Sequence, residues 1–108
     1  YADSPLSAHW TPHAQNPVVV DSRHARNGGI LAEGGRMFRV AQRQGFRGYG
    51  QSFTIREIVT LTPDAYAEQE IAAVAPDFFP ALRGAHHLHS DGVYSVFDFL
   101  EAVDKRNR

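Results

Sequence analysis

Residues 23–61 read RHARNGGILAEGGRMFRVAQRQGFRGYGQSFTIREIVTL and contain the clearest secondary-structure pattern of the chain. Within them, Gly34-Gly35 separates the short runs 30–33 and 36–40. A Gly-Gly pair between such runs suits the positive φ angles of a two-residue hairpin turn. The sequence therefore predicts two antiparallel strands joined by a tight turn. The loop that follows is interrupted by three glycines: Gly45, Gly48 and Gly50.

A longer strand is predicted at residues 53–61, because apolar side chains recur there at nearly every second position. The face expected to be buried carries Phe53, Ile55, Val59 and Leu61. The other face carries Thr54, Arg56, Ile58 and Thr60. Glu57 lies on the apolar face and is the exception to a pattern that is otherwise typical of a half-buried strand.

Short extended segments are also expected on both sides of this region. We expect residues 18–20 to form a brief buried strand or an extended plug, and Trp10 to anchor the N-terminal loop to the body of the fold. Residues 65–75 are compatible with a helix or a strand, and we favour a strand for their second half. Residues 76–83 are predicted to be a loop.

A second hairpin is expected over residues 85–100, because Asp91-Gly92 is a strong turn signal. The charged tail 101–108 is expected to be a helical turn or frayed. Together these segments predict an all-β, antiparallel meander of about six or seven short strands. At 108 residues the chain is one domain or part of one.

Composition limits the classes of partner. The chain is 43% hydrophobic, which can supply a core, and its 11 Lys and Arg against 12 Asp and Glu give a net charge of −1. This balance argues against binding to nucleic acid or to acidic membranes. There is no cysteine, which excludes disulfides and thiolate metal sites. No apolar run approaches the roughly 20 residues of a membrane helix.

The first residues, Tyr1-Ala2-Asp3-Ser4-Pro5, have neither the charged region nor the apolar region of a signal peptide. We therefore expect a cytoplasmic rather than a secreted location. The initiator methionine is also missing. We expect the chain to begin inside a longer gene product.

Three spaced motifs carry a resemblance to a known family. They are R-x-A-R-x-x-G-x-[IL], G-x-x-F-R-x-x-Q and Y-G within residues 23–50, preceded by His13-x-x-Asn16-Pro17-Val18. The pattern resembles the β-propeller domain at the N-terminus of glucosamine inositolphosphorylceramide transferases. Similar domains occur beside formyltransferase-like modules in bacteria, and the domain is similar to the five-bladed propellers of furanosidase-type glycoside hydrolases.

The resemblance covers roughly residues 1–100. It implies that the 108 residues are a partial domain, about the last one to two blades of a five-bladed propeller. Sheet edges left by such a piece would be covered by the missing blades or by a second copy of the chain. The chain departs from the family at Val40 and at Asn27-Gly28-Gly29, where the family tends to have proline-containing segments.

Arg39, Gln42 and Tyr49 are the first candidate ligand-binding residues. If residues 37–38 lie in mid-strand, a guanidinium, an amide and a phenol converge near a strand end. Such a group suits sugar hydroxyls or a phosphate. In the alternative, Arg39 and Gln42 bond loop carbonyl groups between blades.

Histidines form the second group. The resemblance implies that His86 either faces the propeller funnel or makes a structural hydrogen bond, and His13 joins it in the candidate ligand-binding set. His87 and His89, with Asp91, have the spacing of possible metal ligands. No third ligand is assured, and we predict neither a metal nor another cofactor.

No catalytic residue is predicted. A nucleophile elbow is missing, and the carboxylates Asp21, Glu57, Asp91 and Asp98 show no pairing in the sequence. We expect non-catalytic recognition of a carbohydrate or phosphosugar by a domain that accompanies a transferase. The alternatives are a structural or assembly β module without a ligand and a part of a glycoside hydrolase propeller that supplies only substrate contacts.

Overall fold

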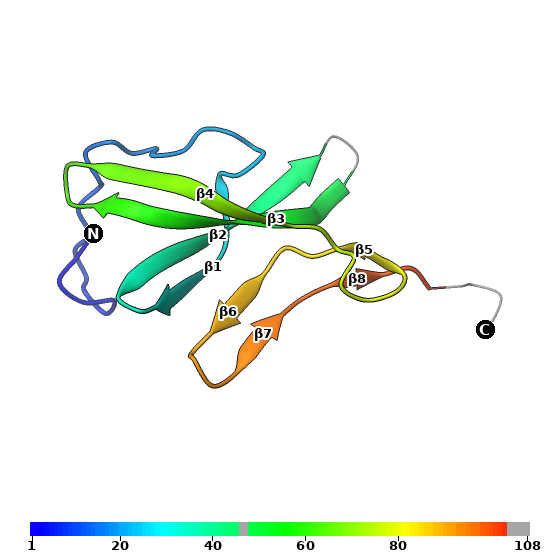
Figure 1. The fold of residues 1–108 in the computed structure, drawn as a ribbon. Helices are drawn as coiled ribbons and strands as arrows, with labels where there is room; N and C mark the ends of the chain where they lie inside the picture. Colours follow the sequence, from blue (N-terminus) through cyan, green and yellow to red (C-terminus); the bar gives the residue numbers. More distant parts are fainter. Residues whose placement is uncertain (46–47, 104–108) are drawn as a thin grey trace.

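The computed structural model describes residues 1–45 and 48–103, which form an all-β fold (Figure 1). In chain order the strands are β1 (Arg26–Glu33), β2 (Arg36–Gly45), β3 (Gly48–Leu61), β4 (Tyr66–Val74), β5 (Leu82–Gly84), β6 (Leu88–Ser90), β7 (Ser95–Phe97) and β8 (Leu100–Glu101). Within the described ranges no helix has the length and apolarity needed to cross a membrane.

Four of the strands form one antiparallel sheet in the order β1-β2-β3-β4, so each strand pairs with its neighbour in the chain. The C-terminal part adds two small antiparallel pairs, β5 with β8 and β6 with β7. Figure 1 shows these pairs beside the large sheet, with the N-terminal segment running past the β3–β4 turn. The prediction of an all-β antiparallel meander is confirmed.

The turn between β1 and β2 is the predicted two-residue hairpin. Gly34 and Gly35 have φ angles of 57° and 76°, and Glu33 pairs directly with Arg36. Positive φ at both central residues is the requirement of this tight turn, and only glycine meets it without steric cost.

Strand β3 is confirmed and begins earlier than expected, but its alternation does not continue to the end. Phe53 is buried, whereas Val59 and Leu61 are exposed. The pairing of β3 with β4 shifts register between Ile55 and Arg56 and again between Ile58 and Thr60. The first shift leaves Ile71 of β4 without a partner and the second leaves Val59 of β3 without one, so the alternation along β3 is interrupted at Val59.

Residues 66–74 all belong to β4, so the strand favoured for the second half of this segment extends through the first half as well. Phe53 of β3 pairs with Val74, and Leu61 pairs with Tyr66. The Ala- and Glu-rich composition favours a helix locally. Backbone pairing along β3 overrides that propensity.

Two predictions for the N-terminal segment are wrong. Residues 18–20 form no strand, and Val18 and Val20 are exposed. Trp10 is exposed as well, and its Nε1 donates a hydrogen bond to the carbonyl oxygen of Ser7, 3.0 Å away in the same loop. The ring therefore closes a local turn and does not anchor the loop to the body of the fold.

Two polar residues, His13 and Gln15, connect the N-terminal loop to the large sheet. Nε2 of His13 lies 2.7 Å from the carbonyl oxygen of Thr62, and Oε1 of Gln15 accepts a hydrogen bond of 2.8 Å from the backbone N–H of Tyr66. Both partners stand at the turn between β3 and β4. The N-terminal segment is thus held at one end of the large sheet.

The second hairpin is confirmed with shorter strands, since β6 and β7 contain three residues each. Oδ1 of Asp91 accepts hydrogen bonds from the backbone N–H groups of Val93 and Tyr94, which closes the turn. The predicted loop 76–83 ends where β5 begins, at Leu82. The tail begins with β8 instead of a helical turn, and its remainder from 104 lies outside the described residues.

The core lies between the large sheet and the segment that follows β5. Val40, Phe53 and Ala85 are its buried members. Partly buried side chains packed around them are Leu31, Ile55, Val74 and Leu88. The C-terminal segment is therefore part of the core.

Two glycines allow this segment to approach the sheet closely. A Cβ atom at Gly28 of β1 would lie 2.2 Å from the carbonyl oxygen of His86, and one at Gly84 would lie 2.3 Å from that of Gly50. Real Cβ atoms do not tolerate such distances from backbone. The β5 segment is packed backbone to backbone against the large sheet.

We predict that Gly84→Ala destabilises the protein. The added methyl group must push β5 away from Gly50, and overpacking of this kind costs about 1–3 kcal/mol. Urea unfolding followed by circular dichroism would measure the loss.

The matched control is Gly48→Ala, where the nearest atoms to a new Cβ are 3.6 Å away in the side chain of Gln51. This change should alter the free energy of unfolding by no more than about 0.5 kcal/mol. Equal effects at Gly84 and Gly48 would contradict the close packing of β5.

Candidate functional site

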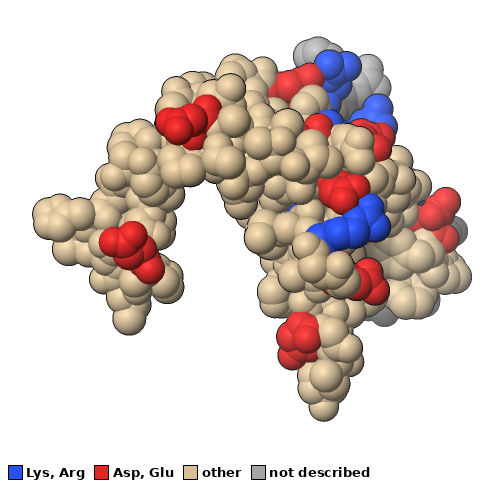
Figure 2. Space-filling view, turned by 60° about the vertical axis from the view of Figure 1, so that its left-hand side comes forward, with Lys and Arg blue, Asp and Glu red and all other residues tan. Residues whose placement is uncertain are grey.

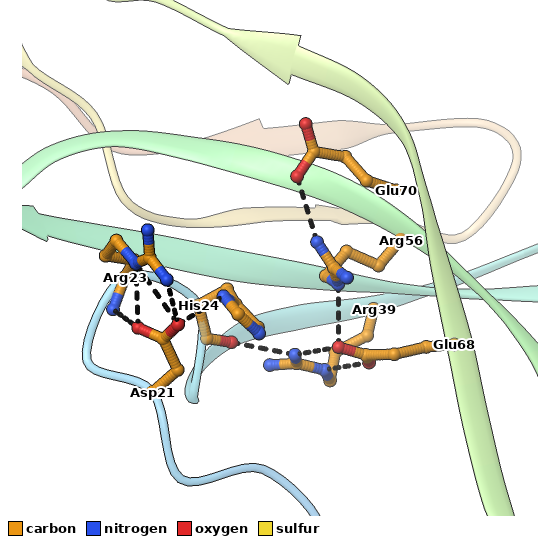
Figure 3. Close-up of polar contacts among 7 residues, drawn as sticks. All are labelled: Asp21, Arg23, His24, Arg39, Arg56, Glu68 and Glu70. Atoms are coloured by element: carbon orange, nitrogen blue, oxygen red, sulfur yellow. Dashed lines mark hydrogen bonds and ion pairs between the residues drawn. The ribbon is translucent and has the colours of Figure 1, made fainter.

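A buried ion-pair network crosses the large sheet on the face opposite the core, and Figure 3 shows it between Arg39, Arg56, Glu68 and Glu70. The Glu68 carboxylate of β4 lies between Arg39 of β2 and Arg56 of β3. Arg39 donates from Nε and Nη2 over 2.7 and 2.6 Å, and Arg56 from Nε over 2.7 Å. The hydroxyl of Tyr66 adds a fourth bond to Glu68, of 2.5 Å.

The centre of this network lies away from solvent, whereas Glu70 at its edge is 50% exposed. The side chains of Glu68, Arg39 and Arg56 are only 6%, 10% and 14% exposed. Nη2 of Arg39 also donates to the carbonyl oxygen of His24, 2.8 Å away, so it joins the loop before β1 to the sheet. The Arg39 guanidinium thus ties β2 to β4 and to the loop before β1.

The surroundings of Glu68 lower the pKa of its carboxyl group. Burial raises the pKa of its carboxyl group, but hydrogen bonds from Arg39 and Tyr66, together with the nearby positive charges, outweigh burial and hold the pKa at about 2. In turn, hydrogen bonding to Glu68 raises the pKa of Arg39. Glu68 and Arg39 are therefore both ionised at neutral pH.

Beside the network lies a cleft of about 430 Å³, which we call the arginine cleft. It is lined by Arg23, His24, Arg43, Thr54, Arg56, Glu70 and Ala73. At its edge Asp21 binds Arg23 through a 2.6 Å ion pair, as Figure 3 shows. Hydrogen bonds from Arg23 lower the pKa of Asp21.

Charges on the molecule are unevenly distributed. In Figure 2, Lys and Arg side chains lie on one side of a broad hollow, close to Asp and Glu side chains. The other side of the hollow carries acidic and uncharged residues. Cations on this face are thus gathered near counter-ions.

A second, smaller pocket of about 230 Å³ lies where the large sheet meets the β5–β8 pair, and we call it the Tyr49–His86 pocket. Its lining consists of Tyr49, Gly50, Gly84, Ala85, His86, Asp98, Phe99 and Leu100. Nδ1 of His86 faces Oδ2 of Asp98 in a close contact. The Tyr49 ring meets the His86 ring edge-on, with centroids 4.9 Å apart.

The polar groups of this pocket are held in place by their neighbours. Oδ1 of Asp98 accepts hydrogen bonds from the backbone N–H groups of His86 and His87, at 2.9 and 2.8 Å. The guanidinium of Arg26 lies over the Tyr49 ring, 5.3 Å from its centroid. An aromatic face, an imidazole and a fixed carboxylate can together contact a small polar ligand.

The structure brings some of the candidate residues together. Tyr49 and His86 share a pocket, and Gln42 is close to it, since Gly28 lies between the Gln42 side chain and the His86 carbonyl group. Arg39 points to the opposite face, because its neighbour Val40 points into the core. His13 lies at the β3–β4 turn.

Arg39 and Gln42 both bond backbone carbonyl groups, one in the loop before β1 and one within β1. Arg39 bonds the His24 carbonyl group, and Nε2 of Gln42 donates to the carbonyl oxygen of Asn27 over 3.3 Å. Their role in ligand binding stays a prediction, as do those of Tyr49, His86 and His13.

Sequence reasoning missed Glu68 as a partner of Arg39. A signal was present in the spacing Tyr66-x-Glu68-x-Glu70, which places three polar side chains on one face of a strand. Asp98 was considered only as one of several carboxylates. In the part of the chain that the structure describes, no three His, Asp or Glu side chains are grouped to hold a metal ion.

Comparison with known proteins gives one match. The family model described as "Glucosamine inositolphosphorylceramide transferase 1, N-terminal" matches residues 1–85. No curated protein and no solved structure matches significantly. The matched range includes β1–β4 and the Tyr49 side of the pocket, whereas His86 and Asp98 follow it.

We predict that Glu68→Gln destabilises the protein by about 3 kcal/mol, because it leaves the buried guanidinium of Arg39 without a counter-charge and removes one of the two that Arg56 has. Glu70→Gln is the matched control. Glu70 is 50% exposed and pairs once with Arg56, so its loss should cost less than about 1 kcal/mol. Urea unfolding of both variants tests this, and equal losses would contradict a central role for Glu68.

We predict that protonation of Glu68 at low pH reduces the stability of the folded protein. The pKa of Glu68 is about 2 in the folded state against an ordinary 4.5, so the unfolded state binds more protons between these values and stability rises with pH there. We expect the free energy of unfolding to fall as the pH is lowered from 4.5 to 2.

Glu68→Gln should flatten this dependence. Some slope should remain, because hydrogen bonds from Arg36 and Gln69 hold the pKa of Glu57 at about 2 as well. Unfolding curves of the unchanged protein and of Glu68→Gln, recorded across this pH interval, would measure the two slopes. A slope unchanged by the substitution would show that Glu68 is not ionised in the way its contacts indicate.

Proposed function

Because the chain belongs to the family of N-terminal domains of glucosamine inositolphosphorylceramide transferase 1, we propose that it is a non-catalytic recognition module linked to a glycosyltransferase. Its ligand is a carbohydrate or phosphosugar, bound in the Tyr49–His86 pocket. The observation that carries the proposal is the convergence, in one pocket, of an accessible aromatic ring with the His86–Asp98 pair.

The chemistry of the pocket suits a sugar. Tyr49 is 57% exposed, so much of its ring is open to the apolar face of a ligand. The imidazole of His86 and the carboxylate of Asp98 supply directed polar contacts at the same place. Both are fixed by hydrogen bonds or ring contacts, which lowers the entropy lost on binding.

The lining also favours binding over hydrolysis. Acid–base cleavage of a glycosidic bond needs two carboxylates about 5 to 9.5 Å apart. Among the described residues that line this pocket, Asp98 is the single carboxylate. One of its oxygens accepts two backbone N–H groups, which is a positioning arrangement.

We further propose that the large sheet is one blade of a β-propeller. A four-stranded antiparallel meander is the repeating unit of that architecture, and β1–β4 has this order. The edges of such a sheet need a covering partner. Further blades of the same protein, or a second copy of the chain, fulfil this need.

An assembly module without a ligand is the second candidate. An aromatic cluster favours it: Phe78, Phe79, Phe97 and Phe99 contact one another, and all four are at least partly exposed. Exposed apolar patches of this kind mark interaction surfaces. In this reading, the polar residues of the pocket serve only the fold.

Tyr49→Ala distinguishes the two candidates. Loss of the ring should weaken binding at least about fivefold, since an aromatic contact is worth about 1 kcal/mol. The family's name contains glucosamine and an inositol phosphate, so glucosamine and inositol 1-phosphate are suitable probes. Binding would be measured by NMR titration of the 108-residue chain.

Tyr94→Ala is the control, because Tyr94 is 73% exposed at the turn of the β6–β7 hairpin, outside the pocket. It should bind both probes like the unchanged protein. Binding that is lost equally in the two variants, or no binding of either probe to the unchanged chain, would favour the assembly module. Thermal unfolding of both variants separates lost binding from lost folding.

A further inference from the structure

The arginine cleft lies on the face of the large sheet opposite the core. Phe53 points toward Ala85 in the core, so its neighbour Thr54 points to the other face. On β2, Val40 points into the core, so the side chains of Ala41 and Arg43 point to the same face as Thr54. Ala41 pairs with Thr54 in the sheet. The cleft is thus separate from the Tyr49–His86 pocket, with which it shares no lining residue.

The hydroxyl group of Thr54 has no hydrogen-bond partner among the residues that the structure describes. It is only 6% exposed, and its Oγ1 is buried without a hydrogen-bond partner. A buried hydroxyl without a partner is costly, and most such groups in proteins are satisfied. Thr54 lines the arginine cleft, so a ligand there can accept its hydrogen bond.

Most of the polar groups in the cleft that are not already hydrogen-bonded within the protein are hydrogen-bond donors. Arg23 uses Nε and Nη2 on Asp21, which leaves Nη1. Arg56 uses Nε and Nη1 on Glu68 and Glu70, which leaves Nη2. The two carboxylates at the cleft, Asp21 and Glu70, are already bound to arginine.

Arg43 adds a complete guanidinium group to these donors. It forms no ion pair with any residue in the described ranges, and it lines the cleft together with His24. A site with spare guanidinium N–H groups and one hydroxyl calls for a ligand that is rich in acceptors. Phosphate and carboxylate groups have the geometry that guanidinium forks prefer.

We propose that the arginine cleft binds an oxyanion group, a phosphate or a carboxylate, of a small ligand. Arg43 supplies the main charge, the hydroxyl of Thr54 donates to one oxygen, and Arg23 and Arg56 contribute their remaining N–H groups. The site is independent of the proposed sugar pocket, since it rests on different residues on the other face of the sheet.

Thr54→Val and Arg43→Gln test the site directly. The first removes one hydroxyl and keeps the shape, and because that hydroxyl has no partner, the fold should keep its stability. Each variant should raise the Kd for inorganic phosphate about tenfold, the usual effect of one hydrogen bond to a charged group. Calorimetry or NMR titration at constant ionic strength gives the Kd.

Arg83→Gln is the charge-matched control, since Arg83 is an exposed residue of β5 and lies outside the cleft. It should leave the Kd within about twofold of the unchanged value, as screened long-range charge has little effect. Titrations with glucose 1-phosphate and with glucuronate then show whether the oxyanion is a phosphate or a carboxylate.

Two results would overturn the proposal. One is no saturable binding of inorganic phosphate, glucose 1-phosphate or glucuronate by the unchanged chain. The other is an equal weakening by Arg43→Gln and Arg83→Gln with no effect of Thr54→Val, which would mean attraction by net charge alone. Loss of sugar binding in Tyr49→Ala with phosphate binding intact would confirm that the two sites are separate.

Discussion

The Glu68 carboxylate is the interaction on which the polar half of this structure depends. It accepts hydrogen bonds from two arginines and a tyrosine while lying almost completely out of water. Such a charge is tolerated in the interior only when its partners are complete. Because those partners come from β2, β3 and β4, the network ties these strands together, and through Arg39 it also holds the loop before β1.

The apolar half is organised by close backbone contact. Gly28 and Gly84 let the segment after β5 lie directly on the sheet, which brings Ala85 into the core beside Val40 and Phe53. One face of the sheet is therefore partly covered by the C-terminal segment, and the loop before β1 is tied to the other face through Arg39.

Sequence patterns identified the local structure well. The Gly34-Gly35 turn, the Asp91 turn and the alternation at Phe53 follow from backbone geometry, which a few residues determine. The bulges in the pairing of β3 with β4 and the exposure of Trp10 depend on how distant segments pack, and a single sequence contains no signal for that. For the candidate site, Tyr49 and His86 were identified as candidates, whereas Glu68 required knowing that β4 pairs beside β3.

The Tyr49–His86 pocket exists only because two sheets meet. Tyr49 and Gly50 come from the large sheet, while His86 and Asp98 come from the segment that packs on it. The family match covers residues 1–85, so Tyr49 and the large sheet lie within the matched range, whereas His86 and Asp98 follow it. Since Gly84 permits the contact that positions His86, packing of β5 and the chemistry of the pocket are controlled by the same few atoms.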